Sequence, residues 1–179
     1  GRPAQGKGVA RGDILGAALA LLDEGGGKAL TMRALADQLG VTPMSLYNHV
    51  ADRNGLLVAL SDQVYGDVLE GLPSEADERT EIRALLIRYH DAVARHPHLT
   101  LAIFAEPEAF AGVSRQITDR LALLLTAITP EHLLWRNLLI DHAHGSGLAF
   151  TAARGDQHLA DAMRAQYLQA LDCLLARLA

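Results

Sequence analysis

The segment from Thr31 to Arg53 gathers side chains that can bind anions and nucleobases. They carry hydroxyl, amide, imidazole and guanidinium groups, at Thr31, Arg33, Thr42, Ser45, Tyr47, Asn48, His49 and Arg53. Such groups donate hydrogen bonds to phosphate oxygens and to the edges of base pairs. The chemistry that this segment offers is therefore recognition of a duplex nucleic acid.

Two short helices are expected to hold these side chains. After Thr31, whose hydroxyl can cap the helix that follows, the apolar residues Leu35, Ala36 and Leu39 form one stripe, and Gly40 ends it. Pro43 opens a second helix that should run to about Val50, because proline suits a first turn. The turn between them is tight enough to cross the two helices steeply, which predicts a helix-turn-helix.

The polar residues of this motif divide into two groups. In a helix-turn-helix the second helix enters the major groove, so its exposed N-terminal side should meet base edges, here with Thr42, Pro43, Met44, Ser45 and Asn48. The flanking donors should contact phosphate and fix the register; they are Arg33, Tyr47, His49 and Arg53, with Thr31 at a helix N-terminus.

Helical periodicity also dominates the rest of the chain, and no strand-like alternation persists. The spacing predicts about nine helices. They run from near Ile14 to the glycines at 25–27, over 31–39 and 43–50, from a cap at Asp52 to about 70, and over 78–95, 99–104, 112–128, 130–154 and 156–178. Leu72, Pro73 and Ser74 should break the fourth helix and open a short linker. An all-α fold with two domains is expected.

Composition and charge narrow the possible partners. The 179 residues are half hydrophobic but only 4% aromatic, which indicates a Leu- and Ala-rich globular protein. The single cysteine, Cys173, excludes a disulfide framework or a Cys-rich zinc module and favours the cytoplasm. No apolar stretch approaches the roughly 18 residues of a membrane span, so no membrane partner is expected. Residues 1–11 should form a mobile basic arm.

The net charge of −5 is divided unevenly. Residues 1–60 carry six basic and five acidic side chains, whereas residues 61–179 carry ten basic and sixteen acidic ones. On average, only the first third of the chain would not repel a polyanion.

Residues 14–57 resemble the DNA-binding region of the TetR family of bacterial transcriptional regulators. The resemblance rests on Leu39, Gly40, Val41, Leu46, Tyr47, His49, Arg53, Leu56 and Leu57, with Arg53 where the family usually has lysine. It implies a homodimeric transcription factor, a repressor that a small, largely apolar ligand releases from double-stranded operator DNA. Residues 1–72 would hold the basic arm, the helix-turn-helix and the connecting fourth helix, and residues 73–179 would bind the effector and dimerise.

The expected effector and dimer contacts lie in this second region. Candidates for the ligand site are the sparse large or polar side chains in Leu-rich helices, namely Tyr89, His96, Phe104, Phe110, Trp135, His142 and Phe150. The last two helices are apolar on more than one face, which favours dimerisation, and the resemblance implies a four-helix bundle between two copies. The expected contacts are Ala143, Gly147, Leu168, Leu171 and Leu175.

Two other functions are kept open, and catalysis is not supported. His96 and His98 could converge on a metal if they lie on a loop, although no cysteine joins them; alternatively, the chain could be a helical adaptor without a DNA role. Ser146 lies in a His-Gly-Ser-Gly run that lacks the strand-to-helix elbow of a hydrolase nucleophile. No enzyme, cofactor, catalytic residue or metal is predicted.

Overall fold

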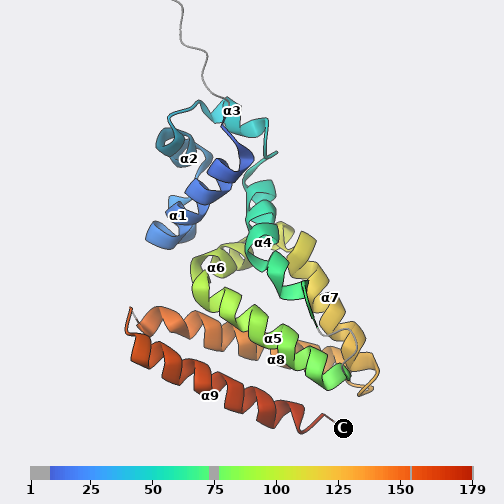
Figure 1. The fold of residues 1–179 in the computed structure, drawn as a ribbon. Helices are drawn as coiled ribbons and strands as arrows, with labels where there is room; N and C mark the ends of the chain where they lie inside the picture. The colour runs from blue at the N-terminus through green and yellow to red at the C-terminus, as the bar shows by residue number, and fades with distance from the viewer. Residues whose placement is uncertain (1–8, 73–76, 154, 179) are drawn as a thin grey trace, which may run out of the picture.

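The computed structural model describes residues 9–72, 77–153 and 155–178, and within them it contains nine α-helices and no strand (Figure 1). The all-α fold is confirmed. The helices are α1 (Arg11–Ala29), α2 (Met32–Leu39), α3 (Pro43–Tyr47), α4 (Arg53–Leu69), α5 (Glu78–Arg95), α6 (Pro97–Ala105), α7 (Gly112–Thr126), α8 (His132–Ala149) and α9 (Gln157–Leu175), with 3-10 turns η1 (Pro107–Ala109) and η2 (Phe150–Ala153). Most of the basic arm and Pro73 and Ser74 of the expected linker lie outside the described residues.

Local capping chemistry explains where several helices begin. Thr31, Asp52, Asp77 and Asp156 each accept a hydrogen bond from the backbone N–H three residues later, which satisfies one free donor of the first turn. Gly40 ends α2 in the left-handed region, at φ 65°. The sequence pattern identifies these boundaries because each depends on neighbouring residues only.

Several helix ends differ from expectation, including that of α9, which ends at Leu175 rather than near residue 178. The glycines at 25–27 do not end α1; only Gly26 leaves the helical region, at φ 67°, and the helix continues beyond this kink to Ala29. Helix α3 ends at Tyr47 rather than near Val50, and α8 gives way to the η2 turn at Phe150 rather than continuing to residue 154.

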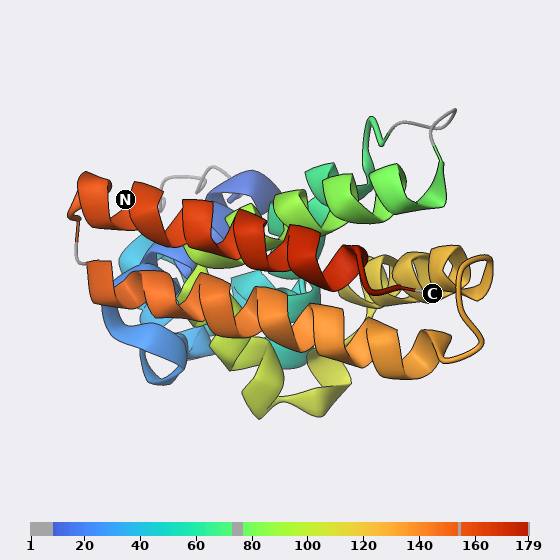
Figure 2. The same cartoon turned by 90° about the horizontal axis from the view of Figure 1, so that it is seen from below.

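The helix-turn-helix and the last two helices occupy opposite ends of the molecule. Figure 1 shows α1, α2 and α3 at one end, α4 leading away from them, and α8 and α9 at the other end. In Figure 2 these last two helices lie side by side on the outer face. One continuous apolar core runs through the molecule, from Ile14 in α1 to Leu171 in α9. None of the described helices is long and apolar enough to cross a membrane.

Small residues let α8 pack closely on α5 in the same protomer. Ala143 and Gly147 are buried, and a Cβ added at Gly147 would lie 2.7 Å from Val93 Cγ1. Leu171 and Leu175 of α9 are buried inside the protomer too, whereas Leu168 is half-buried. The assignment of Ala143, Gly147, Leu171 and Leu175 to a partner contact is therefore wrong, because their own chain already covers them.

The close approach of α8 to α5 predicts that Gly147→Ala destabilises the protein. The added methyl would overlap the buried Val93 and the Ala94 backbone, so the free energy of unfolding should fall by about 1–3 kcal/mol. Gly16→Ala is the matched control, since nothing lies within 4 Å of a Cβ at this α1 position, and it should stabilise by about 0.5–1 kcal/mol. Urea unfolding at one fixed protein concentration measures both. Equal effects of the two substitutions would contradict the described packing.

Candidate nucleic-acid interface and effector cavity

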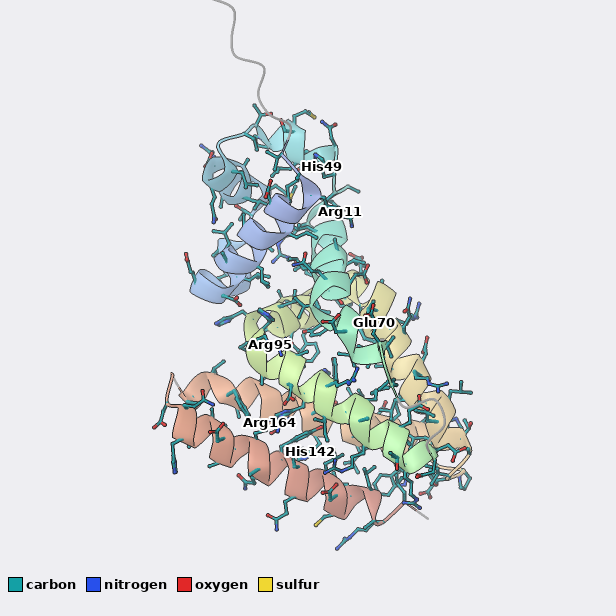
Figure 3. The ribbon with its side chains drawn as sticks, in the orientation of Figure 1. Arg11, His49, Glu70, Arg95, His142 and Arg164 are labelled. Carbon is teal, nitrogen blue, oxygen red and sulfur yellow. The ribbon has the colours of Figure 1, made fainter. Side chains whose placement is uncertain are left out.

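Helix α3 presents its polar residues at the tip of the molecule. Leu46 is fully buried and anchors the helix, whereas Met44 is 72% exposed and Tyr47 is 46% exposed. The other predicted contact residues that are exposed are Thr31, Arg33, Thr42, Pro43, Asn48 and His49. Figure 3 shows His49 at this end, near Arg11. Nearly all of the predicted DNA contacts are thus accessible to solvent.

The turn before α3 holds the surface of α3 in a defined shape. The hydroxyls of Thr42 and Ser45 are hydrogen-bonded to each other at 3.0 Å, so Ser45 is only half-exposed. Thr31 caps α2 by accepting from the Ala34 backbone N–H at 3.1 Å.

Arg53 differs from the other predicted DNA contacts, because its guanidinium points into the protein. It donates to the carbonyl oxygens of Gly27 and Leu30, at 3.0 and 3.1 Å, and forms a 2.7 Å ion pair with Glu106. The side chain therefore binds the end of α1 and the end of α6 together. Its positive charge is partly buried and compensated within the protein.

Two further polar contacts join the same elements. Asn54 donates to the Glu108 carboxylate at 2.9 Å, and the His96 ring lies 3.4 Å from the Asp23 carboxylate. His96 thus faces α1, whereas the sequence analysis had assigned it to a ligand site or, with His98, to a metal site. Among the described residues, no three His, Cys, Asp or Glu side chains are placed to hold a metal ion.

Three of the seven predicted ligand residues surround one small cavity. Tyr89 of α5, Phe104 of α6 and Phe110 after η1 line it together with residues that the sequence analysis did not select for a ligand site, namely Tyr65, Thr100, Ile103, Ser114 and His144. The cavity volume is about 20 Å³, which is room for about one water molecule. Phe104 and Phe110, which are 52% and 42% exposed, separate it from solvent.

The polar atoms of this cavity are already paired. The Tyr89 hydroxyl lies 2.6 Å from His144 Nε2, and the Tyr65 hydroxyl lies 2.7 Å from Thr100 Oγ1. Burial lowers the pKa of His144 to about 4, because the charged ring would lose its hydration, and Asp141 opposes this only in part. Burial likewise raises the pKa of Tyr65 to about 12, although the Thr100 hydrogen bond acts to lower it. All four groups are therefore uncharged at neutral pH.

The other predicted ligand residues do not line this cavity. His142 lies on a separate groove of about 400 Å³ between α8 and α9, whereas Trp135 is half-buried against the core and Phe150 packs edge-on against His90. Trp135, His142 and Phe150 therefore do not form one site with the other predicted ligand residues. His144 faces the cavity instead, and only the packing of α8 against α5 and α7 reveals this.

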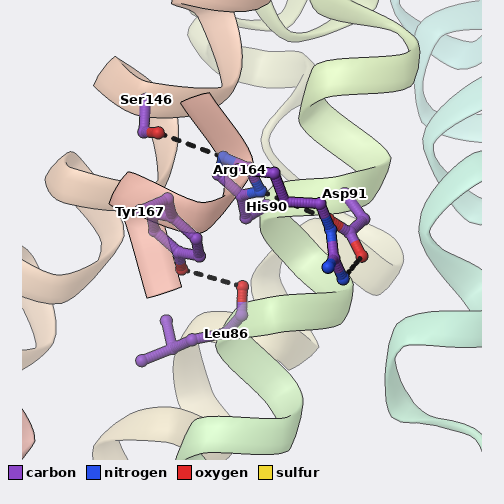
Figure 4. Close-up of polar contacts among 6 residues, drawn as sticks. All are labelled: Leu86, His90, Asp91, Ser146, Arg164 and Tyr167. Atoms are coloured by element: carbon purple, nitrogen blue, oxygen red, sulfur yellow. Dashed lines mark hydrogen bonds and ion pairs between the residues drawn. The ribbon is translucent and has the colours of Figure 1, made fainter. Parts of the chain in front are cut away.

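A second polar cluster lies between α5, α8 and α9 (Figure 4). The buried His90 ring stacks on Tyr167 at 3.7 Å, and its two nitrogens lie 3.1 Å from Ser146 Oγ and 3.3 Å from Asp91 Oδ1. Arg164 donates two hydrogen bonds to the Asp91 carboxylate. Burial alone would raise the pKa of Asp91, but His90 and Arg164 lower it to about 2.

The hydrogen bonds that link Ser146 to His90 and His90 to Asp91 resemble those of a Ser-His-Asp hydrolase triad. However, Ser146 lies within α8, so the backbone N–H groups around it already bond along the helix and cannot stabilise an oxyanion. The Asp91 carboxylate is also held by an arginine. The cluster fastens α9 to α5, and it supports no catalytic step.

The neutral state of His144 predicts a pH dependence of stability. The unfolded chain binds a proton at this residue below a pKa of about 6.5, whereas the folded protein does so only near 4. Its contribution is therefore present above pH 6.5 and is lost as the pH falls to 4, by about 1–3 kcal/mol. His144→Gln should flatten the unfolding free energy in this window, as measured by urea titration at several pH values. The exposed His158→Gln is the control, and an unchanged curve for His144→Gln would contradict the burial described.

Comparisons with known proteins agree with this geometry. The family described as "Bacterial regulatory proteins, tetR family" matches residues 14–60, which run from α1 into α4. An HTH-type transcriptional regulator of Saccharopolyspora erythraea is 36% identical over 84 residues, which is 47% of this chain and 36% of that protein. Alignments with the curated relatives span only about a third to a half of their length, between 36% and 51%.

Two solved structures extend the likeness over nearly the whole chain. BioQ with its double-stranded DNA operator is 26% identical with a TM-score of 0.71, over 94% of this chain and 99% of that chain. A TetR variant from Acinetobacter baumannii in complex with minocycline is 25% identical with a TM-score of 0.70, over 94% of this chain and 95% of that chain. The matched helix-turn-helix region and the arrangement of the described helices agree with these structures: residues 14–60 carry the DNA-binding region of the TetR family of bacterial transcriptional regulators, and the chain has the fold of TetR regulators.

Proposed function

We propose that this chain is a cytoplasmic, homodimeric repressor that binds operator DNA and is released by a small, largely apolar molecule. The observation that carries the proposal is the surface of α3, which exposes Met44, Tyr47, Asn48 and His49 above the buried anchor Leu46. The BioQ structure with its operator supports it, since that protein has the same fold.

In this proposal base edges are read by α3 and phosphates by the residues around it. Met44 offers an apolar contact suited to a thymine methyl, and Asn48 offers an amide suited to adenine. Arg33 and His49 flank the helix at exposed positions, where they fit phosphate oxygens. Arg53, the first residue of α4, contributes by positioning the helices rather than by contacting DNA, because its side chain binds the end of α1.

The proposed dimer uses the outer face of α8 and α9, at the end opposite α3 (Figure 2). Leu134 of α8 is 66% exposed, and Leu138 of α8 and Leu159 of α9 are exposed as well. Exposed leucines on two adjacent helices favour burial against a second copy. A two-fold assembly would present two α3 helices to successive major grooves of a palindromic operator.

The proposed response links the cavity to α3 through α6. Phe104 of α6 borders the cavity, and Glu106, directly after α6, pairs with Arg53 at the start of α4. A ligand that displaces Phe104 would shift Glu106 and thereby the contacts of Arg53 with α1. Ligand binding would then favour a separation of the two α3 helices that does not fit the operator. The TetR variant in complex with minocycline supports a ligand site in this fold.

The DNA interface predicts a defined effect of Arg33→Ala. After an operator has been selected from random double-stranded DNA, this variant should bind all sequences more weakly and reduce the salt slope of log K by about one, because one phosphate contact is lost. Arg95→Ala removes the same charge from α5 (Figure 3), and it should leave the slope unchanged. Gel shifts over a salt series measure both. If no sequence were enriched, the chain would instead be a helical adaptor.

The dimer interface predicts that a double substitution, Leu134→Glu with Leu138→Glu, separates the protomers. Both side chains are exposed in the single protomer, so its folding should persist, whereas burying two carboxylates between copies is unfavourable. Sedimentation should show self-association weakened at least about tenfold, with loss of operator binding. Leu101→Glu, at an exposed position on α6, is the control. A stable dimer of the double variant would place the interface elsewhere.

A further inference from the structure

We infer that the effector is an aromatic molecule with an uncharged hydroxyl group. This hydroxyl is the inner end of the ligand and binds the Tyr89–His144 pair in the cavity. This inference rests on the proposed ligand-responsive function and adds the chemical class of the ligand. It follows from the charges, hydrogen bonds and walls of the cavity, taken in turn.

The inner cavity discriminates against charge. Its lining consists of aromatic rings, hydroxyls, one isoleucine and the imidazole of His144, without a lysine, arginine or carboxylate among the residues that line it. The imidazole is itself neutral near pH 7, because burial lowers its pKa to about 4. An ionised group placed here would lose its hydration and gain no counter-ion, which is costly. The inner end of the ligand must therefore be uncharged.

The Tyr89–His144 pair favours a hydroxyl over a carbonyl. Their 2.6 Å hydrogen bond can run in either direction, depending on which ring nitrogen of His144 carries the proton. One direction leaves the Tyr89 oxygen as an acceptor, and the other leaves its O–H as a donor to the ligand. A ligand hydroxyl can donate to Tyr89 in the first case and accept from it in the second, whereas a ligand carbonyl can only accept. A second hydroxyl pair, Tyr65 and Thr100, lines the same cavity.

The walls favour an aromatic body. The His144 ring meets Phe104 edge-on at 4.8 Å and Tyr89 edge-on at 5.4 Å, and Tyr89 meets Tyr65 in the same manner at 5.6 Å. A flat ring that displaces the partly exposed Phe104 or Phe110 would replace these contacts with equivalent ones. Since the closed cavity measures only about 20 Å³, such a displacement must accompany binding.

An outer cleft provides room for the rest of the ligand. It lies between α7 and α8, has a volume of about 290 Å³, and shares Phe110 and His144 with the inner cavity. Arg115, Arg136, Asp119 and Asp141 line it, so both signs of charge are present. Polar or charged substituents of the effector can remain in this cleft, at the opposite end from the buried hydroxyl.

Matched bicyclic probes test the chemical class. The full-length protein is titrated calorimetrically at pH 7.5 with 2-naphthol, 2-naphthoate, 2-naphthylmethylammonium and naphthalene. We expect 2-naphthol to bind at least about tenfold more tightly than either ion. Tyr89→Phe should weaken 2-naphthol about three- to tenfold, because one hydrogen bond is lost, and should leave naphthalene unchanged. Unchanged naphthalene binding also shows that the variant is folded.

Several results would overturn the inference. They are equal affinities for 2-naphthol and 2-naphthoate, 2-naphthol binding that is insensitive to Tyr89→Phe, and no binding of any probe at millimolar concentration. A gel shift of the same preparation with the selected operator, without probe, shows whether only the ligand inference fails or the proposed regulatory function fails as well. If the DNA is bound and the probes are not, only the ligand class is wrong; if the DNA is not bound, the regulatory function itself fails.

Discussion

The guanidinium of Arg53 connects parts of the molecule that are distant in sequence. It reaches back to the carbonyls of Gly27 and Leu30 and forward to the carboxylate of Glu106. The kinked last turn of α1, the start of α4 and the end of α6 therefore share one partly buried cation. A planar group with five donors can bind three such partners at once, and a lysine could not satisfy all of them in the same geometry. This contact acts together with the apolar packing of α1 on α4 and α6 to hold the helix-turn-helix against the remaining helices.

Much of the fold could be predicted because helix boundaries depend on neighbouring residues. The caps at Thr31, Asp52 and Asp77, and the left-handed Gly40, act within three or four residues of themselves. The continuation of α1 past Gly26 could not be predicted in the same way, because Arg53, 26 residues away from Gly27, binds the carbonyls that follow the kink. A run of glycines indicates where a helix can break, but distant partners decide whether the chain resumes it.

The candidate sites were predictable to different degrees. Nearly all of the α3 surface follows from the turn chemistry of one short segment, and only Arg53 turns inward. The cavity depends on how five helices cross. Tyr89, Phe104 and Phe110 could be selected by size within the expected effector region, whereas Tyr65, in the expected DNA-binding region, and the small Ser114 could not. Gly147 is a second case in which the sequence alone does not identify the contact. A small residue indicates close approach, but the sequence does not say whether α5 or a second copy approaches it.

Tyr65 belongs to α4, which begins at Arg53 beside the helix-turn-helix, yet its ring forms part of the cavity wall. One helix thus carries a residue of the proposed effector cavity and begins beside the segment that is proposed to read the operator. Mutations that retune one of these sites will rarely leave the other untouched. Under the proposed function, evolution toward a new effector would be expected to proceed through compensating pairs of changes, one facing the cavity and one near Arg53, rather than through independent optimisation of two modules.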